Sequence, residues 1–312
     1  MMYRFLWEIN NIRPPEWATP NTIVLSRPAF NLRFFQAGHH TLLILPPQAG
    51  HSSCIADYKD GMSLVQHYCS KGYTVFAVEW KSCCCSRANE SIEDLISQVK
   101  EAIHYIGIEV HLVGLCQSGW LAAMFTSRYP EMVDSLTVGG SPIDFAAGDG
   151  YIKKLVHLLP QDFYRSLVWI GGGIMPGAFI LWGFKNMHWW DRYVDDYVKI
   201  WKALDEPQEL ERIRHFRNWY ETTQNIAGVW YLQAVDRLFR RNELVSGKLG
   251  FDLSKIRCPV HLIAGEIDDI TPPPQVLNME NYINSKERHS SVIPKCGHIG
   301  LFIKSAALPY WT

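Results

Sequence analysis

The chain has 312 residues, 47% of them hydrophobic, and a formal net charge of −1. This length and apolar content suit one large α/β domain with an insertion, or two small domains, and exclude an intrinsically disordered chain. Acidic and basic residues are well mixed, which argues against a nucleic-acid partner, because phosphate binding needs a concentrated basic surface.

The N-terminus and the cysteines predict a cytoplasmic protein. Residues 1–8 contain no long apolar stretch and no small-residue cleavage site, so we expect no signal peptide. The eight cysteines are then expected to be reduced thiols rather than a disulfide framework. The run Cys83-Cys84-Cys85 lacks the spacing and the paired histidines of a zinc site. We expect it to lie in a loop, and we expect no bound metal or other cofactor.

Up to residue 145 the pattern predicts strands that alternate with helices. Residues 1–20 carry Pro14, Pro15 and Pro20 and are expected to be irregular. The elements that follow are, in order, strands at 22–26 and 31–36 as an antiparallel edge pair, a strand at 41–45, a helix at 63–70, a strand at 74–78, a helix at 91–106 capped by Ser91, a strand at 110–113, a helix at 120–128, a strand at 136–139 and, much later, strands at 259–264 and 290–293. Such alternation indicates a mostly parallel sheet with helices on both faces.

Between residues 145 and 259 this alternation stops. Residues 146–230 contain seven of the twelve tryptophans and no clear buried strand. We expect this block to be a mainly helical cap over the carboxyl ends of the strands, where α/β sheets bind ligands, and residues 1–145 and 231–312 to form the core. Residues 167–184 carry no charge, but Pro176 and several glycines interrupt them, which favours a buried or substrate-facing segment over a membrane helix. Contact with a lipid-like granule is an intermediate alternative.

The sequence around Cys116 predicts a turn that carries a nucleophile. It reads Gly114-Leu-Cys-Gln-Ser-Gly119, between an expected strand and an expected helix. A nucleophile elbow has this setting, with small neighbours that let the backbone turn sharply, and its usual pattern is G-x-S-x-G. Here sulfur replaces oxygen, and Ser118 stands in place of a glycine. The alternative is an ordinary buried cysteine.

Two later loops offer partners for this cysteine. Asp268 and His298 each come shortly after an expected strand. The order nucleophile, acid, histidine is that of α/β-hydrolases, which predicts an α/β-hydrolase fold with a triad of Cys116, Asp268 and His298. Asp269 and Asp144 are competing acids, and Asp144 is better explained as a turn or cap residue.

The three side chains have distinct roles in this prediction. His298 takes the thiol proton, because the thiolate is the efficient nucleophile and a neighbouring imidazole favours it. Asp268 holds the imidazole in the required tautomer and stabilises the imidazolium. Two backbone N–H groups must stabilise the oxyanion that develops on the substrate. We expect that of Gln117 and, from the loop after the strand at 41–45, that of Gln48 or Ala49.

With these motifs the chain resembles the polyhydroxyalkanoate synthase and intracellular depolymerase group of cysteine α/β-hydrolases, from about residue 20 to residue 300. The segments that carry the resemblance are Leu45–Gln48, Ile55–Val65, Glu79–Trp80, Gly114–Gly119, Ser141–Phe145, Asn242–Leu249, Phe251–Val260 and Gly297–Gly300, with Ala49–His51, Gly139–Asp144 and Asp268–Ile270 closer to the depolymerase branch. In both branches the family acid aligns with Asp268. Ser118 departs from the glycine that synthases usually carry.

The resemblance implies an acyl-transfer enzyme of polyhydroxyalkanoate metabolism that works through a thioester on Cys116 and makes or cleaves 3-hydroxyalkanoate esters. It implies a 3-hydroxyacyl-coenzyme A thioester, or a polyhydroxyalkanoate polymer or oligomer, as substrate, with coenzyme A a part of the substrate and not a cofactor. A granule surface and a second copy of the chain, in a homodimer, are further candidate partners. Two alternatives stay open: a general ester or thioester hydrolase that does not act on polymer, and an inactive granule-binding scaffold.

Overall fold

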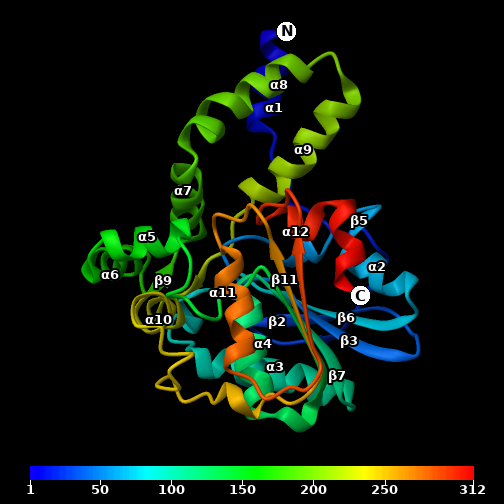
Figure 1. Ribbon diagram of the computed structural model, residues 1–312. Helices are drawn as coiled ribbons and strands as arrows, with labels where there is room; N and C mark the ends of the chain where they lie inside the picture. Colours follow the sequence, from blue (N-terminus) through cyan, green and yellow to red (C-terminus); the bar gives the residue numbers. More distant parts are fainter.

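The computed structural model describes residues 1–312 and places an eight-stranded sheet at the centre of the molecule (Figure 1). The strands are β1 Thr22–Ser26, β2 Phe30–Gln36, β3 His40–Leu45, β6 Tyr73–Trp80, β7 Val110–Leu115, β8 Val133–Gly139, β11 Val260–Gly265 and β12 Arg288–Ile293. Their order in the sheet is β1-β2-β6-β3-β7-β8-β11-β12. A separate short hairpin is made by β4 Asp57–Lys59 and β5 Met62–Ser63.

The six strands from β6 to β12 in this order run parallel, and β1 and β2 form an antiparallel edge. The central strands are buried on both faces: alternate residues of β3 pack into two different clusters, with Leu43 and Leu45 in one and Leu42 and Ile44 in the other. The predicted mostly parallel sheet with an antiparallel edge pair is therefore confirmed. Because β3, β7 and β8 are neighbours, the loops at their carboxyl ends meet.

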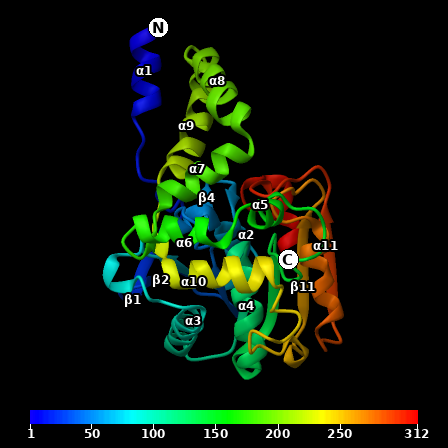
Figure 2. The ribbon, with the colours of Figure 1, turned by 90° about the vertical axis from the view of Figure 1, so that its left-hand side faces the viewer.

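Helices cover both faces of this sheet (Figure 2). They are α2 Leu64–Ser70, α3 Ile92–Ile106, α4 Gln117–Arg128, α11 Pro273–Leu277 and α12 Gly300–Ile303. As predicted, α3 begins after Ser91, whose side chain accepts a hydrogen bond from the N–H of Asp94, and ends at Gly107, where φ is +82°. The helix predicted from residue 120 begins three residues earlier, at Gln117, because the turn at Cys116 leads directly into it.

Residues 146–230, which we call the helical insertion, lie between β8 and β11 in the chain. Their helices are α5 Tyr151–Leu158, α6 Gln161–Ile170, α7 Gly177–Met187, α8 Asp196–Ala203, α9 Pro207–Glu221 and the start of α10 Gly228–Gln233, with β9 Ile174–Met175 paired to β10 Ile226–Ala227. The uncharged stretch is divided between α6 and α7, and no helix of the chain meets the length and apolarity that crossing a bilayer requires. The helices α7, α8 and α9 project from the rest of the molecule (Figures 1 and 2). The division into core and cap stays a prediction.

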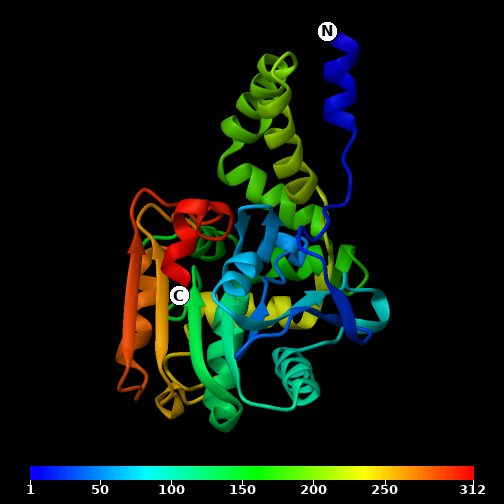
Figure 3. The same ribbon diagram turned by 90° about the vertical axis from the view of Figure 1, so that its right-hand side faces the viewer.

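The expectation of an irregular N-terminus is wrong for α1 Met2–Asn10, which is a helix beside α8 (Figure 3). Phe5 and Ile9 of α1 pack against Ile200 and its neighbours in the helical insertion. Glu8 also forms a partly buried ion pair with Arg214 of α9, at 2.7 Å. The prolines start only after α1 ends, so they do not oppose it, and contacts with residues some 200 positions away in sequence stabilise it.

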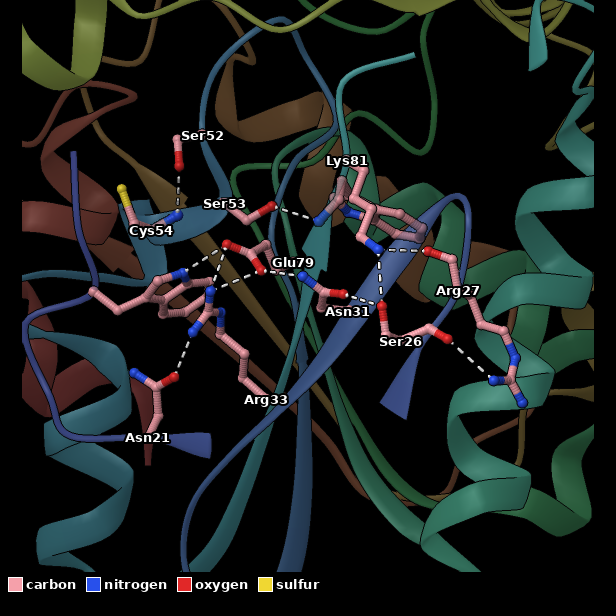
Figure 4. A network of polar contacts seen from close by, with 12 residues as sticks. Asn21, Ser26, Arg27, Asn31, Arg33, Ser52, Ser53, Cys54, Glu79 and Lys81 are labelled. Carbon is pink, nitrogen blue, oxygen red and sulfur yellow. Dashed lines mark hydrogen bonds and ion pairs between the residues drawn. The ribbon is translucent and has the colours of Figure 1, made fainter. Parts of the chain in front are cut away.

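A network of polar contacts joins the N-terminal segment to the sheet edge (Figure 4). Glu79 of β6 accepts hydrogen bonds from Trp17 Nε1 (3.2 Å), Asn31 Nδ2 (2.8 Å) and Arg33 (2.9 Å). Arg33 also donates to Asn21 Oδ1, at 2.6 Å. Burial alone would raise the pKa of Glu79, but the hydrogen bonds from Arg33 and Asn31 outweigh burial and lower it. The carboxylate therefore stays ionised and connects the segment before β1 to β2 and β6.

We expect the free energy of unfolding to fall as the pH drops from about 6.5 to 4, in part because of His111 on β7. Burial lowers the pKa of this imidazole to about 4. The unfolded chain, with a histidine pKa of about 6.5, then binds the proton more readily than the folded chain does, so stability is present above pH 6.5 and is lost toward pH 4. His111 contributes of order 1–3 kcal/mol to the loss in the free energy of unfolding over this pH range.

Urea unfolding at several pH values, on the wild type and on His111→Gln, measures this contribution. The variant should depend less steeply on pH between 6.5 and 4, because carboxylates contribute equally to both proteins. Equal slopes in the two proteins would contradict the assignment to His111, whose Nε2 lies 2.8 Å from Thr137 Oγ1.

Candidate active site

Cys116 occupies a strained turn between β7 and α4. Its φ of +50° and ψ of −121° lie where residues with a side chain are rarely found. Its N–H donates to the carbonyl oxygen of Gly139, at the end of β8, over 2.9 Å. The turn therefore holds the partly buried thiol at the carboxyl edge of the central strands.

Two glycines make this turn sterically feasible. A Cβ on Gly114 would lie 2.5 Å from the Cα of Gly119, and a Cβ on Gly119 would lie 2.4 Å from the Cβ of Ser141. Both distances are too short for any side chain. The glycines at these two positions are thus required for the close approach of β7, α4 and the loop after β8.

Ser118, which departs from the usual pattern, fits the turn without disturbing it. Its side chain is fully buried, and its hydroxyl donates to the carbonyl oxygen of Pro46 at 2.6 Å. The same hydroxyl lies 3.1 Å from Gln117 Oε1. The serine therefore connects the elbow to the loop after β3, a contact that glycine could not make.

His298 and Asp268 lie beside Cys116. His298 Nε2 is 3.0 Å from Cys116 Sγ, and His298 Nδ1 is 2.7 Å from Asp268 Oδ2. The other carboxylate oxygen of Asp268 accepts hydrogen bonds from the N–H groups of Ile270 (3.0 Å) and Thr271 (2.8 Å), which fix its orientation. The structure thus brings the three predicted side chains into one chain of contacts.

The electrostatics favour a proton on the imidazole. His298 and Asp268 are only 6% and 3% exposed. Burial alone would lower the pKa of His298, but the negative charges of Asp268 and Cys116 raise it well above its usual value. The arrangement can therefore hold a thiolate beside an imidazolium, the form of the pair that attacks an acyl carbon.

The two competing acids are engaged elsewhere. Asp269 lies 3.0 Å from His188 Nε2. Asp144 accepts hydrogen bonds from Asn242 (2.8 Å) and Asn278 (2.9 Å). Among the three candidate acids, Asp268 is the one whose carboxylate contacts His298.

The structure separates the candidates for the oxyanion hole. The N–H of Gln48 donates to Gln117 Oε1 at 2.8 Å, so it is already occupied. The N–H of Ala49 has no acceptor, and that of Gln117 opens α4, where helical N–H groups lack an intrahelical partner. Ala49 and Gln117 are thus the available pair, and an oxyanion hole made by them stays a prediction.

Sequence reasoning missed the contacts of two side chains in or beside the loop after β3. The Gln117 carboxamide ties the elbow to Gln48 and leaves its own Nε2 buried without a partner. His51 is buried against aromatic side chains of the helical insertion. Both residues lie in motifs that the sequence analysis singled out, but the motifs gave no sign of what these two side chains contact. No group of three or more His, Cys, Asp or Glu side chains is arranged to hold a metal.

Comparisons with known proteins agree with this fold. The model of the family described as "Protein of unknown function (DUF3141)" matches residues 28–307. The "Poly(3-hydroxyalkanoate) polymerase subunit PhaC" of Allochromatium vinosum is 22% identical over 81% of this chain and 73% of its own length. The protein of the same name from Haloferax mediterranei is 22% identical over 92% of this chain, which spans only 61% of that relative. Among solved structures, mouse "Alpha/beta hydrolase domain-containing protein 10" is 15% identical, with a TM-score of 0.56 over 94% of this chain and 96% of its own.

The sheet, the elbow and these similarities define the class: the chain has the α/β-hydrolase fold and is an enzyme of that class. It belongs to the family described as DUF3141, whose model covers most of its length.

Proposed function

We propose that the chain is an acyl-transfer enzyme of the polyhydroxyalkanoate type, which carries a 3-hydroxyacyl group as a thioester on Cys116. The observation that carries the proposal is the contact of Cys116 Sγ with His298 Nε2 at 3.0 Å, with Asp268 behind the imidazole. The names of the relatives, polymerases of poly(3-hydroxyalkanoate), support this class of acyl group.

In the first half of the proposed reaction the acyl group moves to the enzyme. The thiol proton passes to His298 Nε2, and the thiolate attacks the carbonyl carbon of the acyl donor. The oxyanion is stabilised by the N–H groups of Gln117 and Ala49. As the carbonyl re-forms, the bond to the leaving thiol or alcohol breaks, and the leaving group takes the proton from His298.

In the second half an acceptor removes the acyl group. A hydroxyl group, a thiol or water loses its proton to His298 and attacks the thioester carbon, and Cys116 leaves as the thiolate. A hydroxyl group at the end of a polyester chain gives chain growth, water gives hydrolysis, and coenzyme A gives the reverse of loading. The triad serves all three acceptors equally, so access to the site decides between synthesis and cleavage.

Intact-mass analysis after incubation with 3-hydroxybutyryl-coenzyme A tests this function. Synthesis predicts a ladder of added hydroxybutyryl units on the protein. Depolymerase-type or general hydrolysis predicts release of coenzyme A with at most a single unit bound, and hydroxybutyrate oligomers separate the two, because a general hydrolase leaves them intact. No adduct, no release and no cleavage of oligomers would contradict the proposal and favour an inactive scaffold.

A further inference from the structure

The helical insertion is attached to the loop that carries Ala49, residues 46–52. The N–H of Gln224 donates to the carbonyl oxygen of Gly50 at 2.8 Å. The indole N–H of Trp219 donates to the carbonyl oxygen of Ser52 at 3.0 Å. The residue between these two attachment points is His51, which also forms an isolated bridge with Thr223.

The imidazole of His51 is stacked on the helical insertion. Its ring centroid lies 4.9 Å from that of Trp219 and 5.4 Å from that of Tyr220, with interplanar angles of 27° and 18°. His51 is only 8% exposed, and its Nε2 has no hydrogen-bond partner. Burial lowers the pKa of His51 to about 4, so the ring is neutral at neutral pH. The backbone groups of Tyr220 and Ala49 beside the ring oppose this effect of burial, so the ring contacts the backbone of both segments as well as stacking on Trp219 and Tyr220.

Helix α7 contacts the same loop from a second side. Gly50 has a φ of +88°, and a Cβ there would lie 2.9 Å from the side chain of Ile180. Phe184, one turn further along α7, has its ring centroid 5.8 Å from that of His51. Two helices of the insertion, α7 and α9, therefore contact this part of the loop.

The contacted part of the loop lies next to the available oxyanion donor. Ala49 is two residues before His51, and its N–H has no acceptor. An oxyanion donor works only within a narrow range of about 2.7–3.1 Å from the developing charge, so a small shift of this peptide changes the rate. Gly50 and His51 are thus the residues through which the helical insertion contacts the segment next to this donor.

We propose that His51 is a positioning residue: its stacked ring holds the loop of residues 46–52 against the helical insertion and so sets the N–H of Ala49 for oxyanion stabilisation at Cys116. The proposal rests on the acyl transfer proposed above and adds a residue to it. It also makes the helical insertion a part of the catalytic geometry, since Trp219 and Tyr220 supply the surface on which the ring stacks.

The test compares two reactions of the same thiol. Alkylation of Cys116 by iodoacetamide needs the thiolate and His298 but forms no oxyanion, whereas acylation by 3-hydroxybutyryl-coenzyme A or by a p-nitrophenyl ester does form one. We expect His51→Ala to slow acylation by roughly 10-fold to 100-fold, because removing an oxyanion donor outright costs about 10²–10³. Alkylation of Cys116, followed by peptide mass, should be unchanged. His51→Phe keeps a flat ring, so its Cys116 should be acylated at the wild-type rate.

A matched control is His215→Ala. This histidine of α9 also joins the helical insertion to the core, through Nε2 at 2.7 Å from the carbonyl oxygen of Tyr58, but it does not touch residues 46–52. It should leave both reactions unchanged. If His51→Ala does not fold, Tyr220→Leu removes the stacking partner from the other side and should give the same slow acylation.

Three outcomes would overturn the inference. If acylation is unaffected in His51→Ala, His51 does not position the N–H of Ala49. If acylation and alkylation are lost equally, the role of His51 is purely structural. If His51→Phe is as slow as His51→Ala, stacking of the ring is not what holds the loop. A wild-type protein that reacts with iodoacetamide but with no acyl donor would overturn the proposed function as well. If Cys116 is acylated in the wild type and equally fast in the His51 variants, only the inference about His51 fails and the proposed function stands.

Discussion

Replacing Cys116 by alanine is expected to abolish acyl transfer, with a loss of roughly 10⁴-fold or more, because the reacting atom itself is removed. The substitution takes away the only thiol whose sulfur contacts His298 Nε2, at 3.0 Å. Neither the coenzyme A release nor the mass adduct expected of the wild type should appear. Stability should change little, because the strained φ of +50° is as accessible to alanine as to cysteine.

Cys84→Ala is the matched control for this experiment. Cys84 is exposed, and a hydrogen bond with Ser86 lowers the pKa of its thiol, so it is an accessible sulfur that lies outside the site. Its removal should leave acyl transfer unchanged while removing one site of alkylation. Acyl transfer that survives in Cys116→Ala but is lost in Cys84→Ala would place the nucleophile in the cysteine run and refute the triad.

The parallel sheet could be predicted because its strands are buried on both faces. Continuous apolar runs such as Thr41–Leu45 are typical of such strands, and the structure extends this one by a single residue, to His40. Helix ends were predictable where local chemistry decides them, as at Ser91 and Gly107 of α3. In these places local preference and tertiary packing agree.

The errors fall where distant contacts decide the structure. Nothing local indicates that α1 is helical, and its apolar residues become informative only beside Ile200 and Leu210. The occupied N–H of Gln48 is a similar case, because its partner is the side chain of Gln117, which lies far away in sequence. Sequence order could predict which residues meet at the carboxyl edge of the sheet, but not which of their hydrogen bonds are already made.

Asp268→Asn is expected to slow acyl transfer by roughly 10²–10⁴-fold while leaving the protein folded. The amide keeps an oxygen that can accept from the N–H groups of Ile270 and Thr271, which the carboxylate oxygen Oδ1 now does at 3.0 and 2.8 Å. It removes the charge that, with that of Cys116, raises the pKa of His298. The imidazolium is then less stable, and the pH at which His298 loses its proton should fall, which pH–rate profiles of the variant and the wild type measure.

Asp269→Asn is the matched comparison, because the two aspartates are adjacent and only one of them contacts His298. Asp269 is paired with His188 of the helical insertion, and both side chains are substantially exposed, so the loss of this pair should cost little stability and leave the pH profile in place. The rate constants for acylation of Cys116 by 3-hydroxybutyryl-coenzyme A in the two variants decide between the carboxylates. A larger loss in Asp269→Asn than in Asp268→Asn would mean that the acid loop rearranges during the reaction and that the contact at 2.7 Å belongs to a resting state. The opposite order, with the shift in the pH profile confined to Asp268→Asn, is the expected result, because a charge stabilises an imidazolium effectively only when the two are in direct, buried contact.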